Sequence, residues 1–192
     1  MSLTMKIKQV LAFCLTLALF ACSTTPNHII VAPDMMGFVN QTKYNNKTIN
    51  LAVQDLRSSS HIVQIMQKDK AAVLINSQAN LAEVMKTSLA EQYAKQGLTF
   101  NSQSSNQLEI KLVSAIINVD QTVLKYSTKT QIEFAVTMRN GEQILTKNFR
   151  QSGSSNGPLS PDLAVLGRDF NQQLTKALSK LVNDVEIQNL VK

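Results

Sequence analysis

The feature that most constrains the fold is a long stretch of regular alternation between apolar and polar side chains. From Leu124 to Met138, every second residue is apolar, aromatic or threonine, whereas Lys125, Lys129 and Glu133 lie on the other parity. A period of two is typical of a strand that buries one face. We therefore expect a long strand here, with its apolar face on the core.

Asn-Gly at 140–141 directly follows this strand. The pair predicts a type I′ hairpin, because both central positions of that turn need a positive φ angle. A two-residue loop at these positions predicts two cross-strand apolar pairs: Val136 with Leu145, and Ile132 with Phe149.

Other strands are indicated before the long one. Residues 48–55 alternate cleanly, and weaker extended pieces are expected at 61–66 and 71–75. Residues 107–120 also alternate, but the apolar parity changes near Leu112-Val113. A change of parity moves side chains to the opposite face, so a β-bulge is expected there.

Two helices are predicted. Asn80 with Glu83 forms a capping-box-like start, and Gly97 supplies a left-handed stop after the helix. After an expected flexible loop at 152–160, Ser160-Pro161-Asp162 predicts a second start, with Ser160 as N-cap and proline at the first helical position. The apolar stripe of this helix continues to Val185.

The element order is therefore β(β)αβββα. This order predicts an α+β fold with one antiparallel sheet and two helices packed on one of its faces.

The N-terminal residues predict the localisation of the protein. Lys6 and Lys8 precede an apolar run that ends at Ala21, as in a secretory signal. The run is about 12 residues, shorter than the roughly 20 of a membrane-spanning helix. Its end, "LFAC" at 19–22, resembles the bacterial lipobox, with Cys22 as acceptor. An ordinary secreted protein with a chance cysteine is the alternative.

The lipobox resemblance implies cleavage between Ala21 and Cys22. It also implies an S-diacylglycerol and an N-acyl group such as palmitate on Cys22, and Ser23 after it favours the outer membrane. The expected organisation is a removed signal peptide (1–21), an acylated cysteine with a flexible tether (22–46) and a single periplasmic α+β domain (47–192).

Composition excludes several classes. The net charge is +6, but the lysines are scattered, which does not favour a nucleic-acid partner. After cleavage only Cys22 remains, so no disulfide is expected. No zinc-ligand set, P-loop or dinucleotide fingerprint is present. We expect no metal, no cofactor and no catalytic residue.

In this order of elements the chain resembles the YajG family of bacterial lipoproteins. The resemblance is clearest in the lipobox, in "EQYAKQGLTF" (91–100), in "LEIKLVSAIINVDQ" (108–121) and in "GEQILTKNFRQS" (141–152). It implies an outer-membrane lipoprotein facing the periplasm and carries no assigned activity.

Few residues stand out as candidates for a site. Asp55 and Arg57 share a strand face and form a candidate partner surface, with a structural ion pair as the alternative interpretation. His28 and His61 are predicted to lie in the tether and at a strand edge. The serine between glycines at 153–157 lacks the context of a nucleophile elbow. Met35–Phe38 and Tyr93 are contact or packing candidates.

The leading hypothesis is a non-enzymatic, lipid-anchored periplasmic protein that binds an envelope partner. The rival is a small-ligand or lipid carrier, or an enzyme acting on the cell wall. A deep pocket between helices and sheet would favour the rival.

Overall fold

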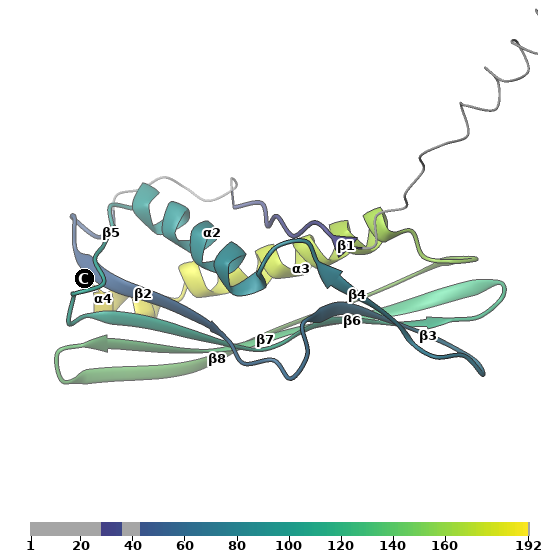
Figure 1. The fold of residues 1–192 in the computed structure, drawn as a ribbon. Helices are drawn as coiled ribbons and strands as arrows, with labels where there is room; N and C mark the ends of the chain where they lie inside the picture. Colours follow the sequence, from purple (N-terminus) through teal and green to yellow (C-terminus); the bar gives the residue numbers. More distant parts are fainter. Residues whose placement is uncertain (1–27, 36–42, 192) are drawn as a thin grey trace, which may run out of the picture.

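The computed structural model describes residues 28–35 and 43–191. The predicted signal peptide, the cleavage site at Ala21 and the lipid attachment at Cys22 lie outside these residues. The described chain contains more β-strand than helix, and Figure 1 shows one extended sheet with helices along one side. The strands are β1 (His28–Ile29), β2 (Thr48–Asp55), β3 (His61–Gln67), β4 (Val73–Ser77), β5 (Thr99–Phe100), β6 (Gln107–Gln121), β7 (Lys125–Asn140) and β8 (Gln143–Pro158).

Strand β6 organises the eight-stranded sheet. Along one edge it pairs with β7, antiparallel, from Gln107–Arg139 to Gln121–Tyr126. Its other edge is shared by two strands, β2 over the first half and β3 over the second, and both are parallel to β6. Strand β4 pairs with β3, and β1 pairs with β4. The sheet is therefore mixed.

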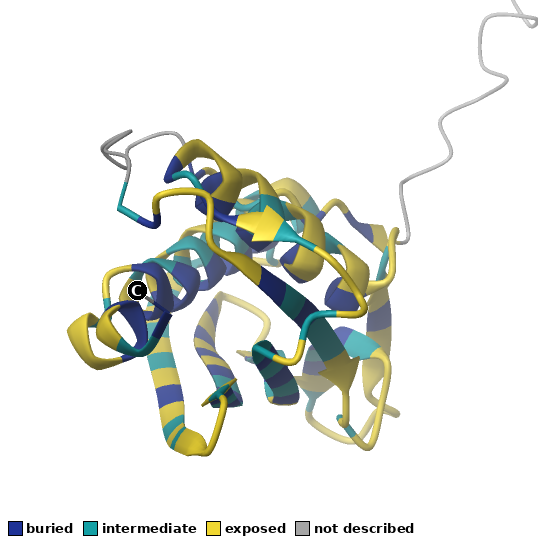
Figure 2. Ribbon diagram, turned by 90° about the vertical axis from the view of Figure 1, so that its left-hand side faces the viewer, coloured by how far each residue is buried: buried dark blue, intermediate teal, exposed yellow. Residues whose placement is uncertain are grey.

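The predicted fold class is wrong. The molecule is mostly β, with a mixed sheet that curves into a half-barrel, and the described residues contain three short helices (Figure 2). The alternation of apolar and polar residues showed which face of each strand is buried. The direction of each strand and the strands beside it depend instead on pairing between residues that are far apart in the sequence. The segment between β2 and β6 carries a hairpin and a helix, long enough for the crossover that parallel neighbours require.

The bulge predicted in β6 is confirmed. The β6–β7 register shifts between Leu112 and Ser114, and Val113 is half exposed. The extra residue returns the apolar side chains of both halves to the same core. Those buried from β6 are Leu108, Ile110, Leu112, Ala115, Ile117 and Val119.

The long strand expected from the sequence is β7, in which buried and more exposed residues alternate. The predicted hairpin register is wrong by two residues. Asn140 pairs with Gln143, so Gly141 and Glu142 form the loop, with Gly141 at a φ of 59°. A shift of two keeps every side chain on its face.

The corrected register changes the facing pairs. Val136 lies opposite Lys147, and Phe134 lies opposite Phe149. The two phenylalanine rings stack with centroids 5.4 Å apart. The predicted loop at 152–160 is also largely wrong, because β8 stays paired with β7 as far as Pro158.

The helices are α2 (Leu81–Lys95), α3 (Leu163–Val182) and α4 (Val185–Val191). Helix α2 is confirmed: the Asn80 side chain accepts from the backbone N–H groups of Ala82 and Glu83, and Gly97 has a φ of 84°. The N-cap of α3 is Asp162 and not Ser160, because the Asp162 carboxylate accepts from the Ala164 N–H at 2.7 Å.

Candidate functional site

A groove runs between the N-terminal segment 28–34 and helix α3. Its volume is about 670 Å³ and most of its lining is apolar. The residues that line it are His28, Ile29, Ile30, Ala32, Asp34, Leu163, Ala164, Gly167, Arg168, Asn171, Gln172 and Thr175. In Figure 1 this segment lies beside α3, and its strand β1 pairs with β4 of the sheet.

One side chain holds the segment on the helix. The Asn171 amide donates to the carbonyl of Ile30 and accepts from the N–H of Ala32, both at 3.0 Å. This pair of bonds mimics the pattern of a neighbouring strand. The same two bonds engage one of the polar side chains that line the groove.

Close packing against α3 and pairing with β4 also hold the same segment in place. Ile29 is buried, and a Cβ added at Gly167 would lie 3.3 Å from its Cγ2 atom. Strand β1 pairs with β4, and the Gln78 N–H donates to the Ile29 carbonyl at 2.8 Å. Strand β1 and the residues that follow it therefore form one wall of the groove.

Polar contacts position the sheet side of α3. Asp169 accepts from the Ser155 hydroxyl at 2.9 Å, and Ser155 in turn bonds Thr128. Ser155 thus lies on strand β8, where it joins the sheet to the helix. The serine between glycines belongs to a strand and not to a flexible loop.

Asp55 and Arg57 meet at the junction of β2 and β3. The Arg57 guanidinium, only 6% exposed, donates to both carboxylate oxygens of Asp55, at 2.9 and 2.7 Å. It also lies within 3.5 Å of the carbonyls of His61 and Ala115. Arg57 therefore fills the gap along β6 between its two parallel neighbours, beside the bulge.

The electrostatics of this pair follow from that geometry. Burial raises the pKa of the Asp55 carboxyl, but the hydrogen bonds and charge of Arg57 outweigh burial, and the pKa is lower than usual. Asp55 is thus held as a carboxylate. The structure brings the two predicted residues together as an ion pair, and their use as a partner surface stays a prediction.

The two histidines lie on either side of strand β4, because His28 of β1 and His61 of β3 both pair with Asn76. His28 lines the groove, whereas His61 begins β3 and contacts the Ser59 hydroxyl through Nδ1. Asp55, the carboxylate nearest to His61 in the sequence, forms an ion pair with Arg57. The described residues contain no cluster of three or more His, Cys, Asp or Glu side chains suited to a metal ion.

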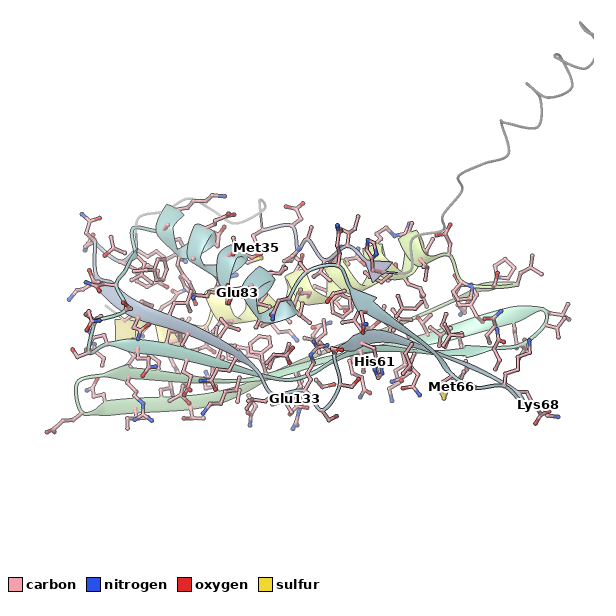
Figure 3. All side chains as sticks on the ribbon, in the orientation of Figure 1. Met35, His61, Met66, Lys68, Glu83 and Glu133 are labelled. Atoms are coloured by element: carbon pink, nitrogen blue, oxygen red, sulfur yellow. The ribbon has the colours of Figure 1, made fainter. Side chains whose placement is uncertain are left out.

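Tyr93 and Met35 belong to the core. Both are buried, and the Tyr93 ring lies edge-on to Tyr44 with centroids 5.9 Å apart. Burial raises the pKa of Tyr44 to about 12. Figure 3 shows Met35 beside α2, and the rest of the 35–38 cluster lies outside the described residues.

Asn171 and Gly167 build the groove, and neither residue stands out in the sequence as a candidate for a site. A polar residue on a helix reveals its partner only when the segment 28–34 is placed beside it. Gly167 gave a weak signal, because glycine inside a helix costs about 1 kcal/mol relative to alanine and so suggests a packing requirement.

In the described part of the chain, no helix has both the length and the apolar character needed to cross a bilayer. A model of the family described as "Uncharacterized lipoprotein" matches residues 35–192. The chain is 21% identical over 176 residues to "Uncharacterized lipoprotein YajG" of Escherichia coli strain K12, covering 91% of each protein. The same protein of E. coli strain CFT073 matches equally well.

Among solved structures, protein XCC0632 from Xanthomonas campestris has a TM-score of 0.52 at 14% identity, covering 83% of this chain and 92% of that one. At this identity the likeness concerns the fold alone. The family match confirms the resemblance found in the sequence: the chain belongs to the family of uncharacterized lipoproteins, as a YajG-type lipoprotein anchored to a membrane of the cell envelope.

Proposed function

We propose that this protein is a non-enzymatic accessory protein that binds an apolar segment of an envelope protein in the groove beside α3. Lipid on Cys22 holds it at the periplasmic face of the outer membrane. The observation that carries the proposal is the groove itself, which is about 670 Å³ in volume, largely apolar and open at the surface.

The chemistry of the groove favours a protein segment over a substrate. Ligand and substrate sites combine an apolar cavity with a few free, convergent polar groups. Here the side-chain amide of Asn171, which lines the groove, is already hydrogen-bonded to the backbone of residues 30 and 32. The accessible surface of the groove is mainly apolar and includes Ile30, which is 65% exposed. Such a surface suits a protein segment that presents a row of apolar side chains.

The anchor supports the same function by limiting diffusion. Each buried methylene contributes about 0.8 kcal/mol, and two or more acyl chains hold a protein stably on a membrane. The acyl chains predicted on Cys22 would therefore keep the groove close to the bilayer, where it meets envelope proteins.

A small apolar ligand is the second candidate, because the groove volume lies within the range of about 300–1,000 Å³ typical of ligand pockets. Extraction and mass spectrometry of the purified protein distinguish the two. A stoichiometric apolar molecule that co-purifies would favour a carrier.

The test of the leading candidate is site-specific photo-cross-linking in cells. A photoreactive residue at Gln172, on the groove, should yield a repeatable adduct with an envelope protein. The same residue at Gln131, on the exposed face of β7, should not. Adducts of equal yield at both positions, or none at Gln172, would contradict the proposal.

A charge placed in the groove gives a matched pair of variants. Ala164→Glu should lower the Gln172 adduct about tenfold, because an uncompensated charge on an apolar contact costs more than about 1.4 kcal/mol. Thr87→Glu, on an exposed position of α2, is the control and should leave the adduct unchanged.

A further inference from the structure

We infer that one end of the domain rests directly on the phospholipid bilayer. Three chain segments meet at this end: the β3–β4 turn, the β6–β7 turn and the last residues of β8. Their proximity follows from the pairing of Gln67 with Gln121 and of Lys125 with Pro158. We call the surface formed by Val123, Leu124 and Leu159, with the flanking Lys68, Lys70 and Lys125, the apolar end.

The apolar end exposes large aliphatic side chains at turn tips. Val123 is 89% exposed, Leu124 is 76% exposed and Leu159 is 63% exposed. Single exposed apolar residues are ordinary on soluble proteins. Three on two adjoining segments form a patch, and such patches mark interaction or membrane sites.

The backbone of Leu159 indicates that this exposure is built in. Its φ angle is 60°, a left-handed conformation that a leucine adopts at a cost in strain. Its N–H donates to the carbonyl of Leu124 at 2.9 Å. The strained residue is thereby tied to the neighbouring turn, and the two leucines project from adjacent positions instead of turning into the core.

Lysines surround the apolar tips. Lys68 and Lys70 line a shallow depression together with Val123, and Lys125 adjoins Leu124 in another. Figure 3 shows Lys68 at this extremity of the sheet. Asp69 and Asp120 lie in the same region, so the net charge there is only slightly positive. The aliphatic side chains supply the insertion, and the lysine stems allow their ammonium groups to reach lipid phosphates.

The place where the N-terminal segment joins the domain indicates that the apolar end contacts lipid. Helix α3 begins four residues after Leu159, and His28 lines the groove beside Leu163 and Ala164 (Figure 1). Cys22 precedes His28 by six residues, which span at most about 22 Å when fully extended. Helix α3 alone is about 30 Å long. The acylated cysteine of the proposed function therefore keeps this end, and not the opposite one, near the bilayer.

The test uses the mature lipoprotein reconstituted into vesicles of phosphatidylethanolamine and phosphatidylglycerol. Val123→Cys carries an environment-sensitive fluorophore, and Ile144→Cys carries it as the matched control. Ile144 is also an exposed aliphatic residue, 58% exposed, next to the β7–β8 turn at the other end of the sheet. Lipids with a quencher on the acyl chain should quench the probe at 123 severalfold more than the probe at 144, and only the probe at 123 should shift to the blue.

The possible outcomes distinguish membrane contact by the apolar end from membrane anchoring through Cys22. Equal, weak quenching at both positions in protein that stays on the vesicles would overturn the inference and leave the anchor intact. Protein that is not retained would overturn both. A blue shift that acyl-chain quenchers do not affect, but that grows with protein concentration, would mean contact with another protein copy and would also overturn it.

A variant of the patch completes the test. Leu124→Ser with Leu159→Gly removes both leucines and relieves the positive φ at 159, so folding should be unaffected. Quenching of the probe at 123 should fall to the level of the probe at 144. Unchanged quenching would contradict a role for the leucines.

Discussion

At the scale of single residues, Arg57 shows how one side chain can complete a sheet. Strands β2 and β3 share an edge of β6 and leave a gap between them. The buried guanidinium fills that gap, reaching the Ala115 carbonyl while it binds Asp55. The role is structural, and it can be measured separately from any partner binding.

We predict that Arg57→Ala lowers the free energy of unfolding by about 2 kcal/mol, because it removes charge-assisted hydrogen bonds and leaves Asp55 partly buried without its partner. Urea denaturation of the mature protein measures this. Arg150→Ala breaks the ion pair with Glu133, in which the arginine side chain is 74% exposed, and should leave the urea midpoint nearly unchanged. Equal losses in both variants would contradict the assignment.

The same pair has a defined pH dependence. The pKa of Asp55 is lowered in the folded state, so the folded protein holds fewer protons there than the unfolded chain at mildly acid pH. The stability that the pair contributes is present at neutral pH and is lost as the pH falls through the lowered folded pKa. The difference between wild type and Arg57→Ala should therefore shrink in acid.

At the scale of elements, the docking of segment 28–34 on α3 depends on few contacts. We predict that Asn171→Ala loosens this segment, because both hydrogen bonds of the amide to the backbone disappear. The overall loss of stability should be small, about 1 kcal/mol. Hydrogen exchange measured by mass spectrometry should become faster in a peptide covering 28–35 and stay unchanged in peptides from β6.

The control is Gln172→Ala, which truncates the exposed neighbour on the same helix. It should leave exchange at 28–35 as in wild type. Identical exchange in the two variants would mean that the Asn171 amide does not hold the segment.

Helices and strands were predictable where the local sequence pattern determines them. Strand β2, helix α2 and the bulge of β6 follow from alternation, capping and a change of parity, all of which are local. The hairpin register failed because Asn140, expected in the turn, is paired with Gln143 and donates its amide to the Leu190 carbonyl of α4. A contact from a distant element is not visible in the neighbouring sequence.

Strand β8 failed for a related reason. Its glycines and serines at 152–157 are typical of a loop. In the fold, a Cβ at Gly153 would meet the Gln173 side chain at 2.6 Å, and one at Gly157 would meet the Tyr126 ring at 2.7 Å. Glycine is present here because side chains approach closely, which is a known role of glycine within strands.

At the scale of the whole molecule, the positions of most long strands were predicted, except for the second half of β8, but their arrangement in the sheet was not. Strand order and direction depend on pairings such as Asn50 with Gln107 and Val63 with Ile117, more than fifty residues apart. No periodicity encodes them. The groove was unpredictable for the same reason, since its two walls come from opposite ends of the chain.

The molecule combines a groove, an exposed aliphatic end and a predicted acylated N-terminus on the same side of one domain. This arrangement would place the groove beside the membrane that carries the anchor. The groove and the apolar end are properties of the fold, but their placement at the membrane depends on lipid at Cys22.

Intact-mass spectrometry of protein purified from its native membrane tests that dependence most directly. We expect a mature chain that begins at Cys22 and carries a diacylglycerol on the thiol and an acyl group on the amino terminus. A mature chain that begins at another residue, or one that begins at Cys22 without added lipid, would contradict the account.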